Sequence, residues 1–100
     1  MKQATNQTEI VLSLAGHDKG QLYLVLRDEG DRALVADGKG RKLATPKRKS
    51  RKHLQSVGTS AHPAAERLHR GEAVSDKEVR AVLAAFRESE FPDGPEKGIQ

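Results

Sequence analysis

The residues best suited to chemistry in this sequence are the lysines and arginines of its middle fifth. Residues 39–60 contain eight Lys or Arg and no Asp or Glu, whereas residues 1–38 and 61–100 each carry a net charge of −2. A guanidinium group can bind two phosphate oxygens at once, and a lysine acts as a mobile point charge. Charge gathered in one segment in this way favours a polyanionic partner, above all a nucleic acid. A solvated basic segment without a partner is the alternative.

Two other groups of side chains could do chemistry, but their surroundings do not favour it. Asp28-Glu29-Gly30-Asp31 gathers carboxylates that could act as acid or base or bind a metal ion, yet no histidine or apolar cluster adjoins them, so the pattern indicates a turn. The histidines lack a third ligand at metal-binding spacing; they are His17, His53, His62 and His69. No hydrolase or phosphate-loop motif occurs. We therefore expect no enzymatic activity, no metal and no cofactor.

Two apolar runs near the N-terminus are the first elements that could position a binding surface. Within residues 10–14 and 22–26, isoleucine or leucine recurs at every second position, which predicts two half-buried strands. The connection Gly16-His17-Asp18-Lys19-Gly20 has a glycine at each end, as is typical of a hairpin-type loop. His17 and Lys19 would therefore lie on an exposed loop tip.

The two runs and their loop resemble the KOW motif, a strand-loop-strand unit of ribosomal proteins and transcription elongation factors. The match consists of the apolar run around Val11, the segment Ala15–Gly20 and the second run from Leu22. Gly20 stands at the motif's defining glycine. His17 departs from the pattern, because arginine or lysine is more usual there.

The resemblance extends over residues 9–57 to the small bacterial KOW-domain RNA-binding proteins. These are similar to a large-subunit ribosomal protein family of archaea and eukaryotes. The resemblance implies a mainly β fold, a small SH3-like barrel of about five strands with a short C-terminal helical tail. It also implies a partner: structured ribosomal RNA of the large subunit, bound in ribosome assembly or translation.

Three further strands are expected, and the fourth has the weakest pattern. They are predicted at residues 33–36, 43–44 and 53–57, with a turn at Asp37-Gly38-Lys39-Gly40. Pro46 limits the fourth strand to an edge or a turn, because proline cannot donate to a ladder. The basic run 47–52 would then lie in or beside an exposed connection.

The region from Gly58 onward predicts two helices. Pro63–His69 has proline in its first turn and a glycine just beyond its end. Ser75 and Glu78 have the spacing of a capping box, so a second helix should begin there and end near Glu90. Its apolar stripe is expected to pack on the barrel or on a partner protein; the stripe consists of Val79, Val82, Leu83 and Phe86.

Two other functions stay open at this point. A KOW domain can act as a protein–protein adaptor in transcription or translation, with apolar barrel surface or the apolar stripe as its contact. The helix pair also resembles a helix-turn-helix, which would suit a DNA-binding regulator, although its acidic residues make a poor phosphate surface. The aromatic residues are Tyr23, Phe86 and Phe91. With Tyr23 as the sole candidate for base stacking, recognition of phosphates and shape is favoured over reading of single strands.

The predicted RNA-binding surface combines the loop tip with the basic segment. Its candidate residues are His17, Lys19, Gly20, Lys39, Arg41, Lys42, Lys47, Arg48, Lys49, Arg51 and Lys52. The predicted organisation is a disordered lead at 1–8, the barrel at 9–58 with its basic segment at 39–53, the helical tail at 59–90 and a flexible end at 91–100. The lack of cysteine and of an apolar stretch of roughly 20 residues predicts a cytoplasmic protein without membrane contact.

Overall fold

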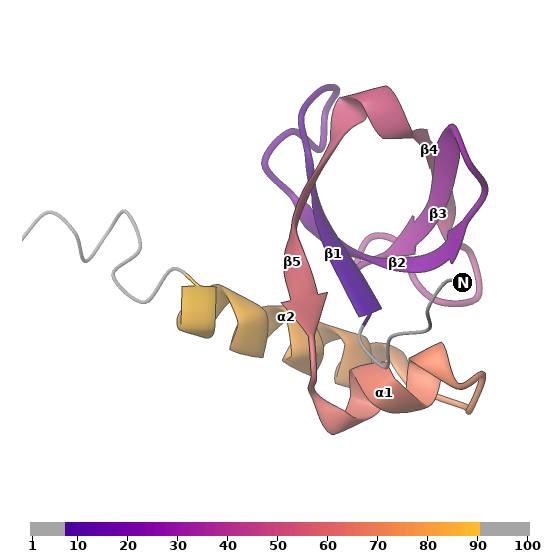
Figure 1. The fold of residues 1–100 in the computed structure, drawn as a ribbon, viewed down its shortest axis with the longest axis vertical. Helices are drawn as coiled ribbons and strands as arrows, with labels where there is room; N and C mark the ends of the chain where they lie inside the picture. The colour runs from indigo at the N-terminus through magenta and orange to yellow at the C-terminus, as the bar shows by residue number, and fades with distance from the viewer. Residues whose placement is uncertain (1–7, 91–100) are drawn as a thin grey trace, which may run out of the picture.

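The computed structural model describes residues 8–90, and within them the chain forms a curved β-sheet covered by two helices (Figure 1). The predicted lead, apart from Thr8, and the predicted flexible end lie outside the described residues. The strands are β1 Thr8–Ser13, β2 Leu22–Asp28, β3 Arg32–Ala36, β4 Lys47–Ser50 and β5 Leu54–Ser60. A 3₁₀ turn η1, Arg51–His53, joins β4 to β5, and the helices are α1 Pro63–His69 and α2 Asp76–Glu90.

The five strands form one antiparallel sheet in the order β4-β3-β2-β1-β5. The mainly β fold with five strands and C-terminal helices predicted from the sequence is therefore confirmed. The ladder does not close, because β4 and β5 are its two edges, so a closed barrel is not confirmed. The sheet nevertheless curls strongly: Lys49 of β4 reaches Ser13 of β1 across 3.1 Å, although two strands separate them in the ladder.

The fourth strand differs from its prediction. Residues 43–44 lie in a turn, and β4 is instead formed by the basic run Lys47–Ser50, which pairs with β3 as an edge strand. Pro46 immediately precedes β4, a position where its missing N–H is tolerated. The run contains no apolar residue, and its inward side chain is Lys49, which is only 8% exposed. Lys49 therefore occupies an inward position at which an alternating strand pattern would predict an apolar residue.

The two faces of the sheet bury separate groups of apolar side chains. One face packs against the helices, where Ile10 and Leu24 meet the α2 stripe. The other face, inside the curl, buries Val11, Tyr23 and Val35. This division explains why β1 is apolar at consecutive positions, since both of its faces are covered.

The apolar stripe of α2 packs on the sheet of its own chain. All four of its residues are buried, and they share a core with β1, β2 and α1. A Cβ added at Gly58 of β5 would lie 2.9 Å from the Phe86 ring, so a glycine at this position lets the helix approach closely. The stripe is therefore not available as the partner-binding surface that the sequence left open.

Both helices begin at the start signals that the sequence contains. α1 has the predicted bounds, Pro63–His69. The Ser75 hydroxyl accepts a hydrogen bond from the Glu78 backbone N–H at 3.1 Å, and the Glu78 carboxylate accepts one from the Ser75 N–H at 2.9 Å. The predicted capping box is thus confirmed. Within residues 8–90, the helices are too short or too polar to cross a bilayer.

Candidate nucleic-acid interface

Four cations of the basic run are paired with carboxylates of the acidic N-terminal region. Arg48 donates two hydrogen bonds to Glu29, at 2.6 and 3.2 Å, and Arg51 donates two to Glu9, at 2.9 and 2.8 Å. Lys49 lies 3.1 Å from one carboxylate oxygen of Asp18, and Lys47 lies 3.8 Å from the other. The charges that are segregated along the sequence are therefore partly neutralised in space. These four residues are therefore less available to phosphate than the sequence alone predicts.

Asp18 lies at the centre of a hydrogen-bonded cluster beneath the loop that joins β1 to β2. Its carboxylate accepts hydrogen bonds from Tyr23 at 2.6 Å, Ser13 at 2.9 Å and Lys49 at 3.1 Å. Burial alone would raise the pKa of Asp18, but the hydrogen bonds from Tyr23, Lys49 and Ser13 and the charge of Lys49 hold it far below its usual value. The carboxylate stays ionised and fixes the loop on the sheet.

Tyr23 belongs to this cluster and cannot stack on bases. Its ring is 3% exposed, and its hydroxyl donates to Asp18. Burial, followed by the hydrogen bond to Asp18 and that carboxylate's charge, raises the pKa of the Tyr23 hydroxyl. The one stacking candidate suggested by the sequence is therefore a core residue, and Phe86 is buried as well.

The loop between β3 and β4 presents a second set of cations and is fixed by Asp37. One carboxylate oxygen of Asp37 accepts hydrogen bonds from the backbone N–H groups of Lys39, at 2.9 Å, and Arg41, at 2.8 Å. The loop is also tied to α2: the Leu43 N–H donates to the Asp76 carboxylate at 2.7 Å, and Arg80 donates to the Gly38 carbonyl. Lys39, Arg41 and neighbouring Lys42 are left exposed to solvent.

Gly38 makes this attachment possible, and its replacement gives a test of it. Its φ is +78°, and a Cβ would overlap the carbonyl oxygen of Asp76 at the start of α2. We expect Gly38→Ala to lower the free energy of unfolding by about 2 kcal/mol, from backbone strain and overpacking. Gly40→Ala in the same loop is the matched control, because nothing lies within 4 Å of its added Cβ. Equal urea denaturation midpoints for the two variants would contradict this account.

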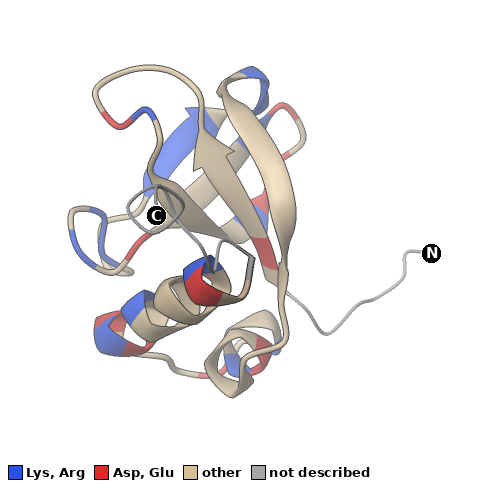
Figure 2. Ribbon diagram, turned by 90° about the vertical axis from the view of Figure 1, so that its left-hand side faces the viewer, with Lys and Arg blue, Asp and Glu red and all other residues tan. Residues whose placement is uncertain are grey.

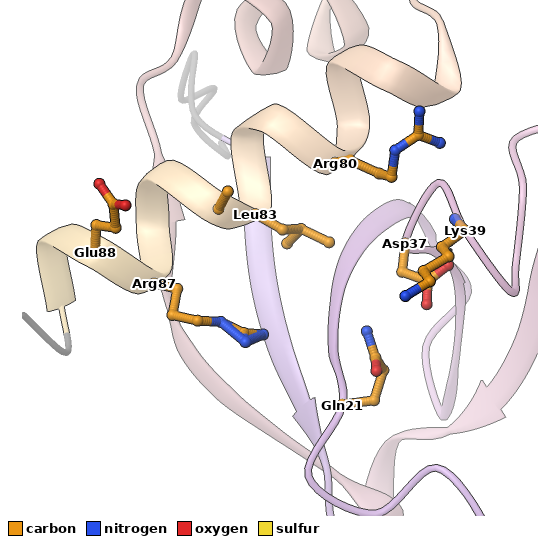
Figure 3. Close-up of a pocket in the computed structure, with 8 residues that line it drawn as sticks. Gln21, Asp37, Lys39, Arg80, Leu83, Arg87 and Glu88 are labelled. Carbon is orange, nitrogen blue, oxygen red and sulfur yellow. Dashed lines mark hydrogen bonds between the residues drawn. The ribbon is translucent and has the colours of Figure 1, made fainter. Parts of the chain in front are cut away.

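Two adjoining depressions lie between the two loops and α2. The first, which we call the helix pocket, has a volume of about 300 Å³ (Figure 3); it is lined by Gln21, Asp37, Lys39, Arg80, Leu83, Ala84, Arg87 and Glu88. The second, the loop pocket, has a volume of about 420 Å³; it is lined by His17, Asp18, Gln21, Tyr23, Asp37, Gly40, Arg41 and Lys47. Gln21 and Asp37 line both, so the two pockets form one continuous area, here called the cationic surface.

The cationic surface gathers some of the predicted residues and leaves others out. His17, Lys39, Arg41 and Lys47 line it, and Lys19, Gly20 and Lys42 lie on the same two loops. Arg48, Lys49 and Arg51 are held by carboxylates, and Lys47 lies 3.8 Å from an oxygen of Asp18. Lys52 is exposed on η1 without lining either pocket. Figure 2 shows Lys and Arg on β4, on the loops and along α2, with Asp and Glu interspersed.

Sequence reasoning missed the contribution of α2. Arg80 and Arg87 are both exposed and line the helix pocket, and Gln21 faces them from the end of the first loop. Their spacing of seven residues places them on one helix face, a signal that was present in the sequence. Two of the acidic residues that count against a phosphate surface on α2 have partners: Glu78 pairs with Arg67 and accepts from the Ser75 N–H, and Asp76 accepts from the Leu43 N–H.

Two carboxylates of the predicted acidic turn at residues 28–31 have structural roles. In the carboxylate turn, Asp28 accepts a hydrogen bond from the Gly30 N–H at 3.0 Å and Glu29 pairs with Arg48. Among residues 8–90, no three His, Asp or Glu side chains lie close enough together to hold a metal ion.

Neither a protein-family model nor a curated protein matches this chain.

Proposed function

We propose that this protein binds structured RNA without catalysis, using the cationic surface to contact phosphates. The observation that carries the proposal is the convergence of exposed cations from separate elements. Lys39 and Arg41 come from the loop before β4, and Arg87 comes from α2. None of these three side chains forms a hydrogen bond or ion pair with another described residue. Free guanidinium and ammonium groups around shallow depressions are suited to a folded polyanion.

The KOW resemblance supports ribosomal RNA of the large subunit as the target, in ribosome assembly or translation. The loop that carries the resemblance, Ala15–Gly20, connects two paired strands, and Gly20 has a φ of +91°. A five-stranded sheet that curls until β4 contacts β1 supports the finer assignment of an SH3-like barrel. Among known functions of such small domains, RNA binding is the one that both the resemblance and the exposed charge favour.

Phosphate and shape recognition is favoured over the two rival functions. An adaptor working through the α2 stripe would need Val79 and Phe86 exposed, and both are buried. A DNA-binding helix pair would need a helix face directed at base edges, whereas the arginines of α2 face the loops of the sheet. An A-form duplex or an RNA junction presents phosphates across a broad surface, which suits cations distributed over two loops and a helix.

Co-sedimentation tests this proposal most directly. The tagged full-length protein would be run from a cell lysate on sucrose gradients at low and high salt, and the RNA in its fractions sequenced. We expect it to travel with large-subunit particles and to leave them steeply as salt rises, with a slope that grows by roughly 0.7 to 0.9 for each neutralised phosphate. A protein that stays at the top of the low-salt gradient without RNA would refute the proposal.

A further inference from the structure

The helix pocket contains side chains that phosphate binding alone does not require. Ala84 of α2 contributes exposed apolar surface, Leu83 lines the pocket although it is only 6% exposed, and Gln21 contributes an amide from the opposite side (Figure 3). A volume of about 300 Å³ lies at the small end of the range for ligand pockets, roughly 300 to 1,000 Å³. Apolar surface together with a neutral hydrogen-bonding group is a lining suited to a flat, polar-edged ring.

Arg87 supplies a planar group at this pocket. In Figure 3 its side chain extends from α2 toward Gln21, while Glu88 points away from both. The Arg87 guanidinium forms no hydrogen bond or ion pair with another described residue. Unstacked RNA bases stack on arginine planes as well as on aromatic rings. Tyr23 and Phe86 are buried, and the guanidinium of Arg80 already donates to the Gly38 carbonyl. The Arg87 guanidinium is therefore the better planar group for a base at this pocket.

Gln21 retains hydrogen-bonding capacity that could read the edge of a base. Its amide nitrogen donates to the Leu22 carbonyl at 3.1 Å, which leaves a second N–H and the carbonyl oxygen for a ligand. Lys39 and Arg80 flank the pocket and can bind the adjoining phosphates. The Asp37 carboxylate lines the pocket too, but one of its oxygens already accepts two backbone N–H groups.

We propose that the helix pocket receives a single unpaired nucleobase turned out of a folded RNA. The base would stack on Arg87 above the apolar surface of Leu83 and Ala84, with its edge on Gln21. This inference rests on the proposed RNA binding and narrows it to RNAs that carry a bulged or looped nucleotide. Regular duplex RNA would occupy the cations but leave the pocket empty.

Two RNA hairpins test the inference, one with a single unpaired adenosine in its stem and one fully paired but otherwise identical. We expect the full-length protein to bind the bulged hairpin about tenfold more tightly in fluorescence anisotropy, as stacking of one base predicts. Ala84→Leu fills the pocket and should reduce the affinity for the bulged hairpin to that for the paired one. Ala81→Leu is the matched control, because Ala81 is also exposed on α2 but does not line the pocket.

A second variant, at Arg87, keeps the positive charge of the side chain but removes its planar guanidinium group. Arg87→Lys should lose the preference for the bulged hairpin and bind the paired one as the wild type does. Equal affinity of the wild type for both hairpins would overturn the inference and leave the proposed function standing, as would equal effects of Ala84→Leu and Ala81→Leu. Failure of both hairpins to bind at low salt would instead count against RNA binding itself.

Discussion

Replacing Lys39 and Arg41 with glutamate is expected to weaken RNA binding by about 100-fold at moderate salt, because two phosphate contacts become repulsions. Both side chains are exposed on the loop between β3 and β4. The fold should survive, because the loop is held by the Asp37 carboxylate through backbone N–H groups that glutamate retains. Filter binding or anisotropy against large-subunit ribosomal RNA measures the loss.

The matched control reverses Arg27 and Arg32, which changes the net charge of the protein by the same amount. These two arginines are exposed at the other ends of β2 and β3, away from the loops of the cationic surface. We expect this control to retain most of the wild-type affinity. If both double variants lose affinity equally, binding depends on overall charge and the cationic surface is not the interface.

Asp18→Asn is expected to lower the free energy of unfolding by about 3 kcal/mol, because it leaves the buried ammonium of Lys49 without a counter-charge. Lys49 is 8% exposed on its side chain and Asp18 17%, so water cannot replace the lost partner fully. Chemical denaturation measures the change. The comparison variant Glu29→Gln removes the charge that pairs with half-exposed Arg48 and should have little effect on stability.

A double variant distinguishes the cost of leaving a buried charge unpaired from the cost of losing the Asp18 carboxylate itself. Asp18→Asn combined with Lys49→Met removes both charges, so it should be more stable than Asp18→Asn alone. An Asp18→Asn protein that unfolds at the same denaturant concentration as wild type would show that this cluster does not hold the loop.

The same carboxylate predicts how stability depends on pH. The pKa of Asp18 is depressed in the folded chain, so its contribution is fully present above the unfolded value of about 3.9 and is lost as pH falls below it. Glu9, whose pKa is lowered chiefly by the hydrogen bond from Arg51, acts in the same direction. Between about pH 5 and pH 3, wild type should therefore lose more stability than Asp18→Asn.

The parts of the fold that sequence predicted well depend on short-range patterns. The existence of β1 and β2, the capping box of Ser75 and Glu78, and the bounds of α1 all depend on residues close together in the sequence. The predicted half-buried alternation was wrong, because both faces of β1 are covered. β4 was missed because its inward residue is a lysine, and only a partner 31 residues away, Asp18, makes burial of that lysine tolerable. Long-range compensation of this kind leaves no local signal.

Only part of the candidate site could be predicted from the sequence, again because contacts between residues far apart in the sequence decide which charges are available. Lys39, Arg41 and Lys47 stood out in the basic segment, yet the segment's charge could not reveal that Glu9, Asp18 and Glu29 would fold back onto it. Arg80 and Arg87 became candidates only when the packing of α2 placed them beside the loop between β3 and β4. Availability of a charge depends on its neighbours in space.

The position of β1 in the sheet determines when the chain can finish folding. β1 precedes the other described strands but pairs with β5, where Thr8 opposes Ser60, and its outer face lies in a core shared with α1 and α2. During synthesis we therefore expect the β1–β2 hairpin to have an unpaired edge and an uncovered apolar face until β5, α1 and α2 have emerged. Long-range pairing of this kind slows folding and exposes a template for misassembly. The charged residues of edge strand β4 disfavour pairing with another chain at one edge of the sheet. At the other edge, β5 pairs with β1 and the helices cover the apolar face.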